Sequence, residues 1–149
     1  MPEDLEQYSL PLKEVNTELG TIIWLNSRQS EPGRLFRPLG DIRHPLKFPV
    51  EYIYLSDFST VDNTSGSHYH KEKEELLFPL TGLFEVLLED TQTHQSETIT
   101  LDSLDHIALY IRPGIAHRIV SLEESGLLLV HASTPASLED TFAYEFTNQ

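Results

Sequence analysis

The sequence of 149 residues contains no cysteine and few basic side chains. The first absence excludes a disulfide framework, a thiol nucleophile and a zinc site with cysteine ligands. Ten lysines and arginines stand against 24 aspartates and glutamates, which gives a formal net charge of −14. A chain this acidic repels phosphate backbones and anionic lipids, so neither nucleic acid nor a membrane surface is expected as a partner.

Long hydrophobic segments are also missing. The longest apolar runs, such as 107–111 and 127–130, are far too short for a membrane-spanning helix. The acidic residues 1–4 lead into no apolar stretch, which is not the pattern of a secretion signal. Together with the absence of cysteine, this pattern favours a cytoplasmic protein.

Hydrophobic residues make up 39% of the chain, enough for a packed core, and the length predicts one domain over residues 1–149. Turn residues separate short apolar runs that have a period near two. Such runs are typical of strands in an all-β sandwich or barrel. The predicted strands are Gly20–Leu25, Val50–Phe58, Glu75–Leu80, Leu83–Glu89, Glu97–Leu101, Asp105–Arg112, Ala116–Ser121 and Gly126–Ser133.

The alternation predicts which side chains share a face, and the ends of the chain are less regular. Residues 1–19 are expected to form a short helix or an arm, 50–133 the core barrel, and 135–149 a tail with aromatic side chains on one face. Two triplets are each expected to line one face of a strand: Phe84, Val86 and Leu88, and Ile107, Leu109 and Ile111.

The segment 66–82 carries the strongest chemical signal. His68 and His70 are two residues apart on an expected strand, so both imidazoles project from the same face. Glu75 follows after a charged turn, and the Pro113–Gly114 turn delivers His117 at the start of another strand. Three imidazoles and a carboxylate suit iron, manganese, nickel, copper or zinc, with positions left open for substrate. The ordinary alternative is a set of hydrogen-bonded histidines beside a solvated acidic turn.

These residues resemble the two motifs of the cupin superfamily. The first motif has an HxH pair, a glutamate and a glycine, and His68, His70, Glu75 and Gly82 match its spacing. The second motif has proline, glycine and histidine, and the match is looser because Pro113 and Gly114 are adjacent. The resemblance implies a double-stranded β-helix, or jelly-roll barrel.

Within the cupins, the chain is most similar to the WxcM-like (FdtA-type) sugar 3,4-ketoisomerases. The similarity is carried by Ser65–Lys71 (SGSHYHK), Tyr110–His117 (YIRPGIAH) and the acidic–aromatic segment Glu139–Tyr144 (EDTFAY). It implies isomerisation of thymidine-diphosphate-linked 4-keto-6-deoxyhexoses, with His68 and His70 as the catalytic pair and no organic cofactor.

Three departures from that family affect the expected chemistry. Ser65 occupies the place of an arginine expected to contact the diphosphate or the sugar, and Ala116 that of a tryptophan. Glu75 replaces a glutamine and restores the anionic ligand that a divalent ion favours. The resemblance thus implies an isomerase framework with a metal-cupin ligand set of His68, His70, Glu75 and His117.

Four further residues are candidates for substrate binding. Arg112 and Arg118 flank the segment that contains the Pro113–Gly114 turn and His117, where they would clamp an anionic substrate or form surface ion pairs with nearby acidic residues. Tyr110 and His131 lie on expected strands. There they would either donate a hydrogen bond to a substrate oxygen or be packed in the core with their polar atoms hydrogen-bonded.

Three functions remain open at this stage. The first is isomerisation of a nucleotide-linked keto-sugar, in which a histidine moves a proton through an enediol. A metal-bound imidazole cannot shuttle protons, so a metal would instead polarise the carbonyl. The others are a metal-dependent cupin of different chemistry, such as a dioxygenase or lyase, and a non-catalytic sugar-binding cupin. A homodimer is expected, with the N-terminal arm and the tail covering exposed strand edges.

Overall fold

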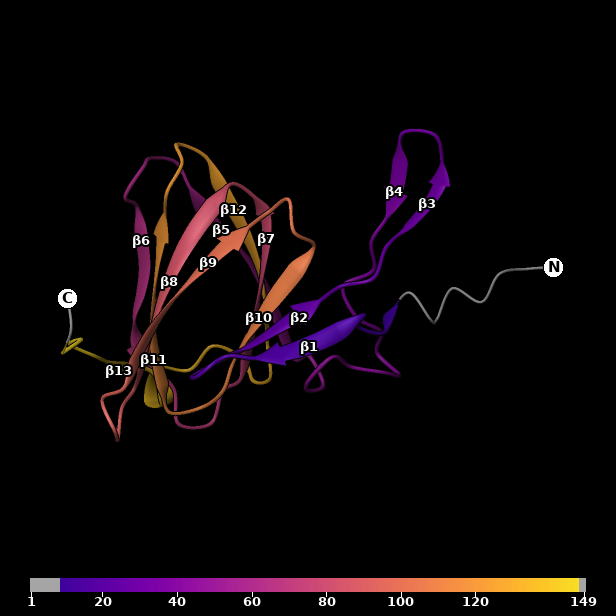
Figure 1. The fold of residues 1–149 in the computed structure, drawn as a ribbon. Coiled ribbons are helices and arrows are strands. Elements are labelled where there is room, and N and C mark those ends of the chain that lie inside the picture. Colours follow the sequence, from indigo (N-terminus) through magenta and orange to yellow (C-terminus); the bar gives the residue numbers. More distant parts are fainter. Residues whose placement is uncertain (1–8, 148–149) are drawn as a thin grey trace.

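The computed structural model describes residues 9–147, and its barrel is formed by two facing antiparallel sheets (Figure 1). One sheet has the order β1-β2-β10-β7-β12-β5, and the other β13-β6-β11-β8-β9. The first contains β1 (Lys13–Asn16), β2 (Thr21–Trp24), β5 (Tyr52–Phe58), β7 (Glu75–Thr81), β10 (Ile107–Ile111) and β12 (Gly126–Ala132). The second contains β6 (Thr64–Tyr69), β8 (Leu83–Asp90), β9 (Ser96–Asp102), β11 (Ile115–Ser121) and β13 (Phe142–Ala143).

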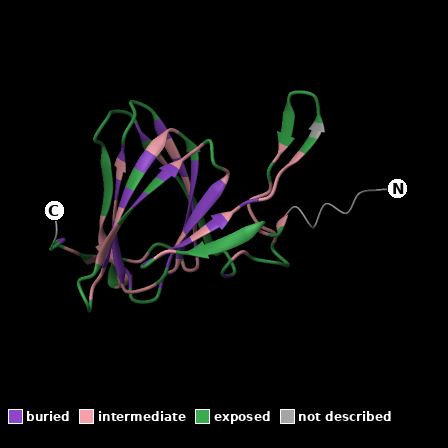
Figure 2. Ribbon diagram, in the orientation of Figure 1, coloured by how far each residue is buried: buried purple, intermediate pink, exposed green. Residues whose placement is uncertain are grey.

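The core fills the space between the two sheets. On β8 the side chains of Phe84, Val86 and Leu88 are fully buried, and the alternation places them in the main apolar cluster. From the opposite sheet β10 adds its own inward triplet, so both predicted triplets are confirmed as core. Figure 2 shows this burial concentrated on the facing strands. The members from the other strands include Phe58, Leu77, Ile99, Leu101, Ile115, Ile119, Leu128 and Val130.

A second apolar cluster lies on the outer face of the six-stranded sheet. Ile23, Leu76 and Phe78 project away from the barrel interior and pack with Phe48 from the segment before β5. The strand β7 therefore has buried residues on both of its faces, which explains its near-continuous apolar sequence. Its Pro79 lies opposite a register shift at Leu127/Leu128 of β12, where a missing N–H is tolerated.

The all-β prediction is confirmed, since no α-helix occurs in residues 9–147. All eight predicted strands are present with small shifts at their ends. A short hairpin of β3 (Arg28–Glu31) and β4 (Arg34–Phe36) was not predicted, and Figure 1 shows it extending away from the barrel. Its sequence is polar and lacks the period-two apolar pattern from which strands are recognised.

The two ends of the chain extend the sheets. Residues 13–16 of the expected N-terminal arm form β1 rather than a helix, whereas residues 1–8 lie outside the described part. The tail forms a one-turn 3-10 helix (Leu138–Asp140) and then β13, which pairs with β6 of its own barrel. No helix among the described residues has the length and apolar character needed to cross a membrane.

Candidate functional site

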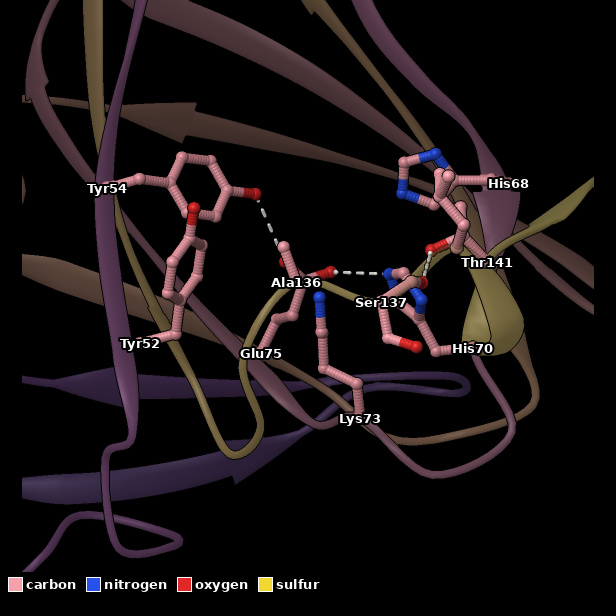
Figure 3. A pocket seen from close by; sticks show the side chains of 10 residues that line it. Tyr52, Tyr54, His68, His70, Lys73, Glu75, Ala136, Ser137 and Thr141 are labelled. Atoms are coloured by element: carbon pink, nitrogen blue, oxygen red, sulfur yellow. Dashed lines mark hydrogen bonds and ion pairs between the residues drawn. The ribbon is translucent and has the colours of Figure 1, made fainter.

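The predicted histidines and glutamate converge at one end of the barrel, between the two sheets. Strands β6 and β11 supply His68 and His117 from one sheet, and Glu75 begins β7 of the other. A pocket of about 400 Å³ opens over this group (Figure 3). It is lined by Tyr52, Tyr54, His68, His70, Lys73, Glu75, Ala136, Ser137, Leu138 and Thr141.

The three imidazoles are in mutual contact. The ring of His68 lies 4.9 Å from that of His70 and 4.8 Å from that of His117, measured between centroids. One nitrogen of each ring and one oxygen of Glu75 all lie within 4.8 Å of one another. The sequence-based prediction that these four residues share one site therefore agrees with the geometry.

Gly66 allows the histidine-bearing strand to approach its neighbour. Its φ is +96°, and a Cβ atom there would lie only 2.6 Å from the backbone oxygen of His117. The pairing of β6 with β11 shifts register between His117 and Arg118, next to this glycine. The close approach of the two backbones brings His68 directly opposite His117.

Glu75 is buried at the centre of the group, with 3% of its surface exposed. Its Oε2 accepts a hydrogen bond of 3.2 Å from the hydroxyl of Tyr54. Its Oε1 lies 3.2 Å from Nε2 of His117 and 3.4 Å from Nε2 of His70, and no well-directed hydrogen bond reaches it. A buried carboxylate oxygen in this setting is stabilised when a proton or a cation lies between it and the imidazoles.

The tail fixes the orientation of His70. Its Nδ1–H donates to the backbone carbonyl of Asp140 at 2.7 Å, which leaves Nε2 without a hydrogen atom of its own, 3.4 Å from Oε1 of Glu75. The Asp140 carboxylate accepts the backbone N–H groups of the turn that follows His70, from residues 71, 72 and 73, at 2.8, 3.2 and 3.0 Å. The 3-10 helix thus acts as a strap across one wall of the pocket.

The environment separates the pKa values of the two pocket histidines. Burial, with the adjacent His117 and His70, lowers the pKa of His68 to about 4, so this ring is neutral near pH 7. Burial also disfavours the charged form of His70, but Glu75 and the Asp140 carbonyl outweigh it and raise its pKa. Glu75 itself is desolvated, yet the adjacent imidazoles of His117 and His70 hold its pKa well below its usual range. The group therefore combines a neutral imidazole, that of His68, with a more basic imidazole, that of His70, beside an ionised carboxylate.

A comparison with known protein families shows which family the chain belongs to. The family model described as WxcM-like, C-terminal (FdtA) matches residues 20–146, most of the chain. The chain belongs to this family. The resemblance predicted from the two histidine motifs and the tail is thereby confirmed.

Relatives of this WxcM-like protein include an enzyme of Aneurinibacillus thermoaerophilus described as a TDP-4-oxo-6-deoxy-alpha-D-glucose-3,4-oxoisomerase. The two chains are 30% identical over 88 residues, and the match spans 59% of this chain and 61% of the relative. The chain thus matches less than two thirds of that relative's length.

Solved structures show the same architecture. The TDP-fucose-3,4-ketoisomerase WlaRA from Campylobacter jejuni superposes with a TM-score of 0.73 at 20% identity, over 85% of this chain and 90% of that one. A dTDP-4-dehydrorhamnose 3,5-epimerase from Bacillus anthracis gives 0.78 at 13% identity, over 92% and 86%. These likenesses confirm the predicted cupin jelly-roll fold.

The four-residue group of this WxcM-like protein also fits a divalent metal. Each residue offers one ligand atom, and the Nδ1 of His70 donates to a carbonyl, as the second nitrogen of a metal-binding imidazole commonly does. The buried Oε1 of Glu75 is the anionic ligand of the set. The residues that would hold the ion are His68, His70, Glu75 and His117.

The structure does not bring the four predicted substrate-binding residues to the pocket. Tyr110 lies on the outer face of the six-stranded sheet, where its hydroxyl donates to Glu74 at 2.5 Å. His131 lies on the same outer face, with its ring 4.7 Å from that of Phe78. Both alternate with inward-facing neighbours on their strands, so their side chains point away from the site.

The two arginines are also placed elsewhere. Arg112 donates to the carbonyl of Leu19 at 3.3 Å and lies 3.7 Å from the Asp90 carboxylate, at the rim of the barrel. Arg118 alternates with the inward His117, and its guanidinium covers the ring of Phe146 in the tail. Neither arginine lines the histidine pocket.

Sequence reasoning missed most of the residues that line or support the pocket, and four of them bear on its chemistry: Tyr52, Tyr54, Lys73 and Asp140. Tyr52 and Tyr54 share the i, i+2 spacing of the histidine pair. This spacing places both rings on one face of a strand, and it could have indicated that they line the pocket together. Lys73 lies in a run of acidic residues, where a lysine ordinarily serves to balance their charge. Asp140 acts mainly through backbone groups 67–69 residues away, a relation that no local pattern indicates.

Proposed function

We propose that this protein isomerises a nucleotide-linked 4-keto-6-deoxy sugar to its 3-keto isomer. The observation that carries the proposal is His70, held by Asp140 and Glu75 at a pocket of a WxcM-like chain. The hydrogen on C3 leaves as a proton, the C4 carbonyl oxygen gains a proton, and an enediol forms between C3 and C4. The C3 hydroxyl then loses its proton while C4 gains one, so no electrons are exchanged with a redox cofactor.

His70 is the proton carrier in this proposal. Its Nδ1–H is fixed by the Asp140 carbonyl, so Nε2 is the nitrogen that accepts the C3 proton and returns it at C4. His70 is the more basic of the two pocket histidines, because its pKa is raised whereas that of His68 is lowered to about 4. Glu75 stabilises the imidazolium form of His70 between the two transfers.

His68 and the two tyrosines bind the sugar oxygens. The neutral imidazole of His68 both donates and accepts a hydrogen bond, which suits a hydroxyl or a keto oxygen. Tyr54 and Tyr52 line the opposite wall with their rings 5.7 Å apart. Burial and the Glu75 carboxylate raise the pKa of Tyr54, so its hydroxyl stays protonated and able to donate.

The direct test is conversion of TDP-4-keto-6-deoxy-D-glucose, followed by NMR of the sugar protons. Appearance of a 3-keto product supports the isomerase. Binding of the nucleotide sugar without conversion supports a non-catalytic sugar-binding cupin instead, and the absence of both would contradict a nucleotide-sugar function.

A second candidate is a metal-assisted reaction at the same residues. It is favoured by the buried Oε1 of Glu75, which faces two Nε2 atoms without a well-directed hydrogen bond. A bound divalent ion would act as a Lewis acid on the keto oxygen, or serve other cupin chemistry such as that of a dioxygenase or lyase. His70 would then be a ligand and unable to carry protons, so the two candidates exclude each other.

Chelation separates these candidates. Because the first mechanism uses no metal, we expect isomerase activity to persist after treatment with EDTA and exchange into metal-free buffer. Metal content is measured in parallel on wild type and on Glu75→Gln, which keeps the shape of the side chain and removes its charge. A metal near one equivalent in wild type, absent from Glu75→Gln and required for activity, would replace the first candidate with the second.

We also propose that the protein is a homodimer that uses the edge strand β5. Four consecutive side chains from Tyr52 to Leu55 are exposed on this edge, including Ile53 at 59% and Leu55 at 57%. An exposed apolar edge of this kind pairs readily with another chain. The tail was a predicted interface, but in the described structure it covers β6 of its own barrel.

Light scattering tests the dimer. The expected mass is about 34 kDa, twice the 17.0 kDa of one chain. Ile53→Lys, which places a charge on this edge, is expected to give monomers, whereas Thr98→Lys on β9, the edge strand of the other sheet, is expected to remain dimeric. A wild-type monomer at micromolar concentration would contradict the proposal.

A further inference from the structure

Lys73 is a buried cation that neither the fold nor the proposed proton transfer accounts for. It lies in the turn between β6 and β7, and its backbone N–H donates to the Asp140 carboxylate at 3.0 Å. Only 7% of its surface is exposed. Among the ten residues that line the pocket, it is the only lysine or arginine.

The ammonium of Lys73 has no carboxylate partner within 4 Å among residues 9–147. Lys47, in contrast, forms an ion pair of 2.8 Å with Glu14, and the exposed Lys71 lies over the ring of Phe142. Figure 3 shows the Lys73 side chain extending into the pocket, with its ammonium directed toward the region of Glu75. Its positive charge disfavours the protonated form of both pocket histidines, although the pKa of His70 remains raised because of Glu75 and the Asp140 carbonyl.

A lysine with a purely structural role on a turn usually extends its charged end to bulk solvent. In this turn the side chain instead carries its charge inward, toward the acid–base group. A fixed positive charge in a sheltered pocket lowers the energy of any state in which negative charge develops beside it.

We propose that Lys73 is a further catalytic residue, whose ammonium stabilises the negative oxygen of the enediolate formed between C3 and C4 of the sugar. This inference rests on the proposed isomerase function. The charge appears when His70 removes the C3 proton before the keto oxygen is fully protonated. The electron pair of the C3–H bond moves into the C3–C4 bond, and that of the C4 carbonyl moves onto its oxygen.

The position of Lys73 favours the reacting oxygen over the diphosphate. The diphosphate is attached at C1, across the sugar ring from C3 and C4. Lys73 shares the pocket with His70 and Glu75, which act at C3 and C4, and its turn is held by the same strap residue, Asp140, that orients His70. An ammonium beside the enediolate also supplies the charge stabilisation for which a metal ion would otherwise be needed.

Steady-state kinetics of Lys73→Met, Lys73→Arg and Lys71→Met test the inference with TDP-4-keto-6-deoxy-D-glucose as substrate. We expect Lys73→Met to lower kcat by about 10²–10³-fold with little change in KM, because the interaction is made mainly in the transition state. Lys73→Arg keeps the charge and is expected to recover part of the loss. Lys71→Met makes the same charge change on the same turn and is expected to behave as wild type.

Three results would overturn the inference. They are a kcat of Lys73→Met close to that of wild type, a loss confined to KM, which places the ammonium on the diphosphate, and an equal loss in Lys71→Met. Thermal melting shows whether each variant is folded. If Lys73→Met does not fold, Lys73→Gln takes its place. A wild type that converts no substrate refutes the isomerase function and the inference together, whereas an active wild type with an equally active Lys73→Met refutes the inference alone.

Discussion

Replacing His70 with asparagine is expected to lower kcat for 3,4-isomerisation by about 10²–10⁴-fold, the usual contribution of a general acid–base group. Asparagine can still donate toward the Asp140 carbonyl, but it cannot take up and return a proton. The loss should therefore fall on kcat, with KM for the nucleotide sugar close to that of wild type. Initial rates from NMR or coupled assays over a range of substrate concentrations measure both constants.

His44 provides the matched control for this substitution. It is exposed in the segment before β5 and lies outside the pocket, so His44→Asn is expected to leave kcat and KM unchanged. Retention of wild-type kcat by His70→Asn would show that the proton is carried by another group. His68 would then be the first residue to examine.

Gly66→Ala is expected to destabilise the protein far more than Gly114→Ala. Both glycines have positive φ, +96° and +84°, so alanine at either position carries backbone strain of about 1–2 kcal/mol. At Gly66 the new Cβ would also lie 2.6 Å from the His117 carbonyl oxygen, whereas at Gly114 no atom lies within 4 Å. Displacing β6 from β11 adds a further cost of about 1–3 kcal/mol. Denaturant unfolding measures the difference between the two variants.

The same displacement separates His68 from His117, so Gly66→Ala should also lose activity under conditions where it remains folded. Gly114→Ala should retain most of the wild-type stability. Equal unfolding free energies for the two variants would show that the close approach of β6 to β11 is not a constraint on the site.

The site was predictable from the sequence where its residues follow a strand period or a motif spacing. His68 and His70 share a face because they are two residues apart, and the spacing to Glu75 matched a known motif. The same period also excludes Tyr110 from the site, because Leu109 and Ile111 on either side of it face the core. His131 is excluded in the same way by Val130 and Ala132.

The rest depended on contacts between distant segments. Asp140 orients His70 through a backbone carbonyl, and no side-chain pattern encodes that hydrogen bond. Lys73 lies in a charged turn, where the sequence does not indicate which side chains point inward. Tyr52 and Tyr54 lie on an edge strand with apolar residues on both faces, so its inward face was not evident.

The most direct test of the account uses TDP-4-keto-6-deoxy-D-glucose labelled with deuterium at C3. The wild-type protein, free of added metal, is incubated with this substrate, and the sugar is analysed by NMR. The account predicts a 3-keto product in which part of the C3 deuterium reappears at C4, because Nε2 of His70 serves both carbons, and no such product from His70→Asn. An unchanged substrate that keeps its C3 deuterium, or the same product formed at the same rate by His70→Asn, would contradict it.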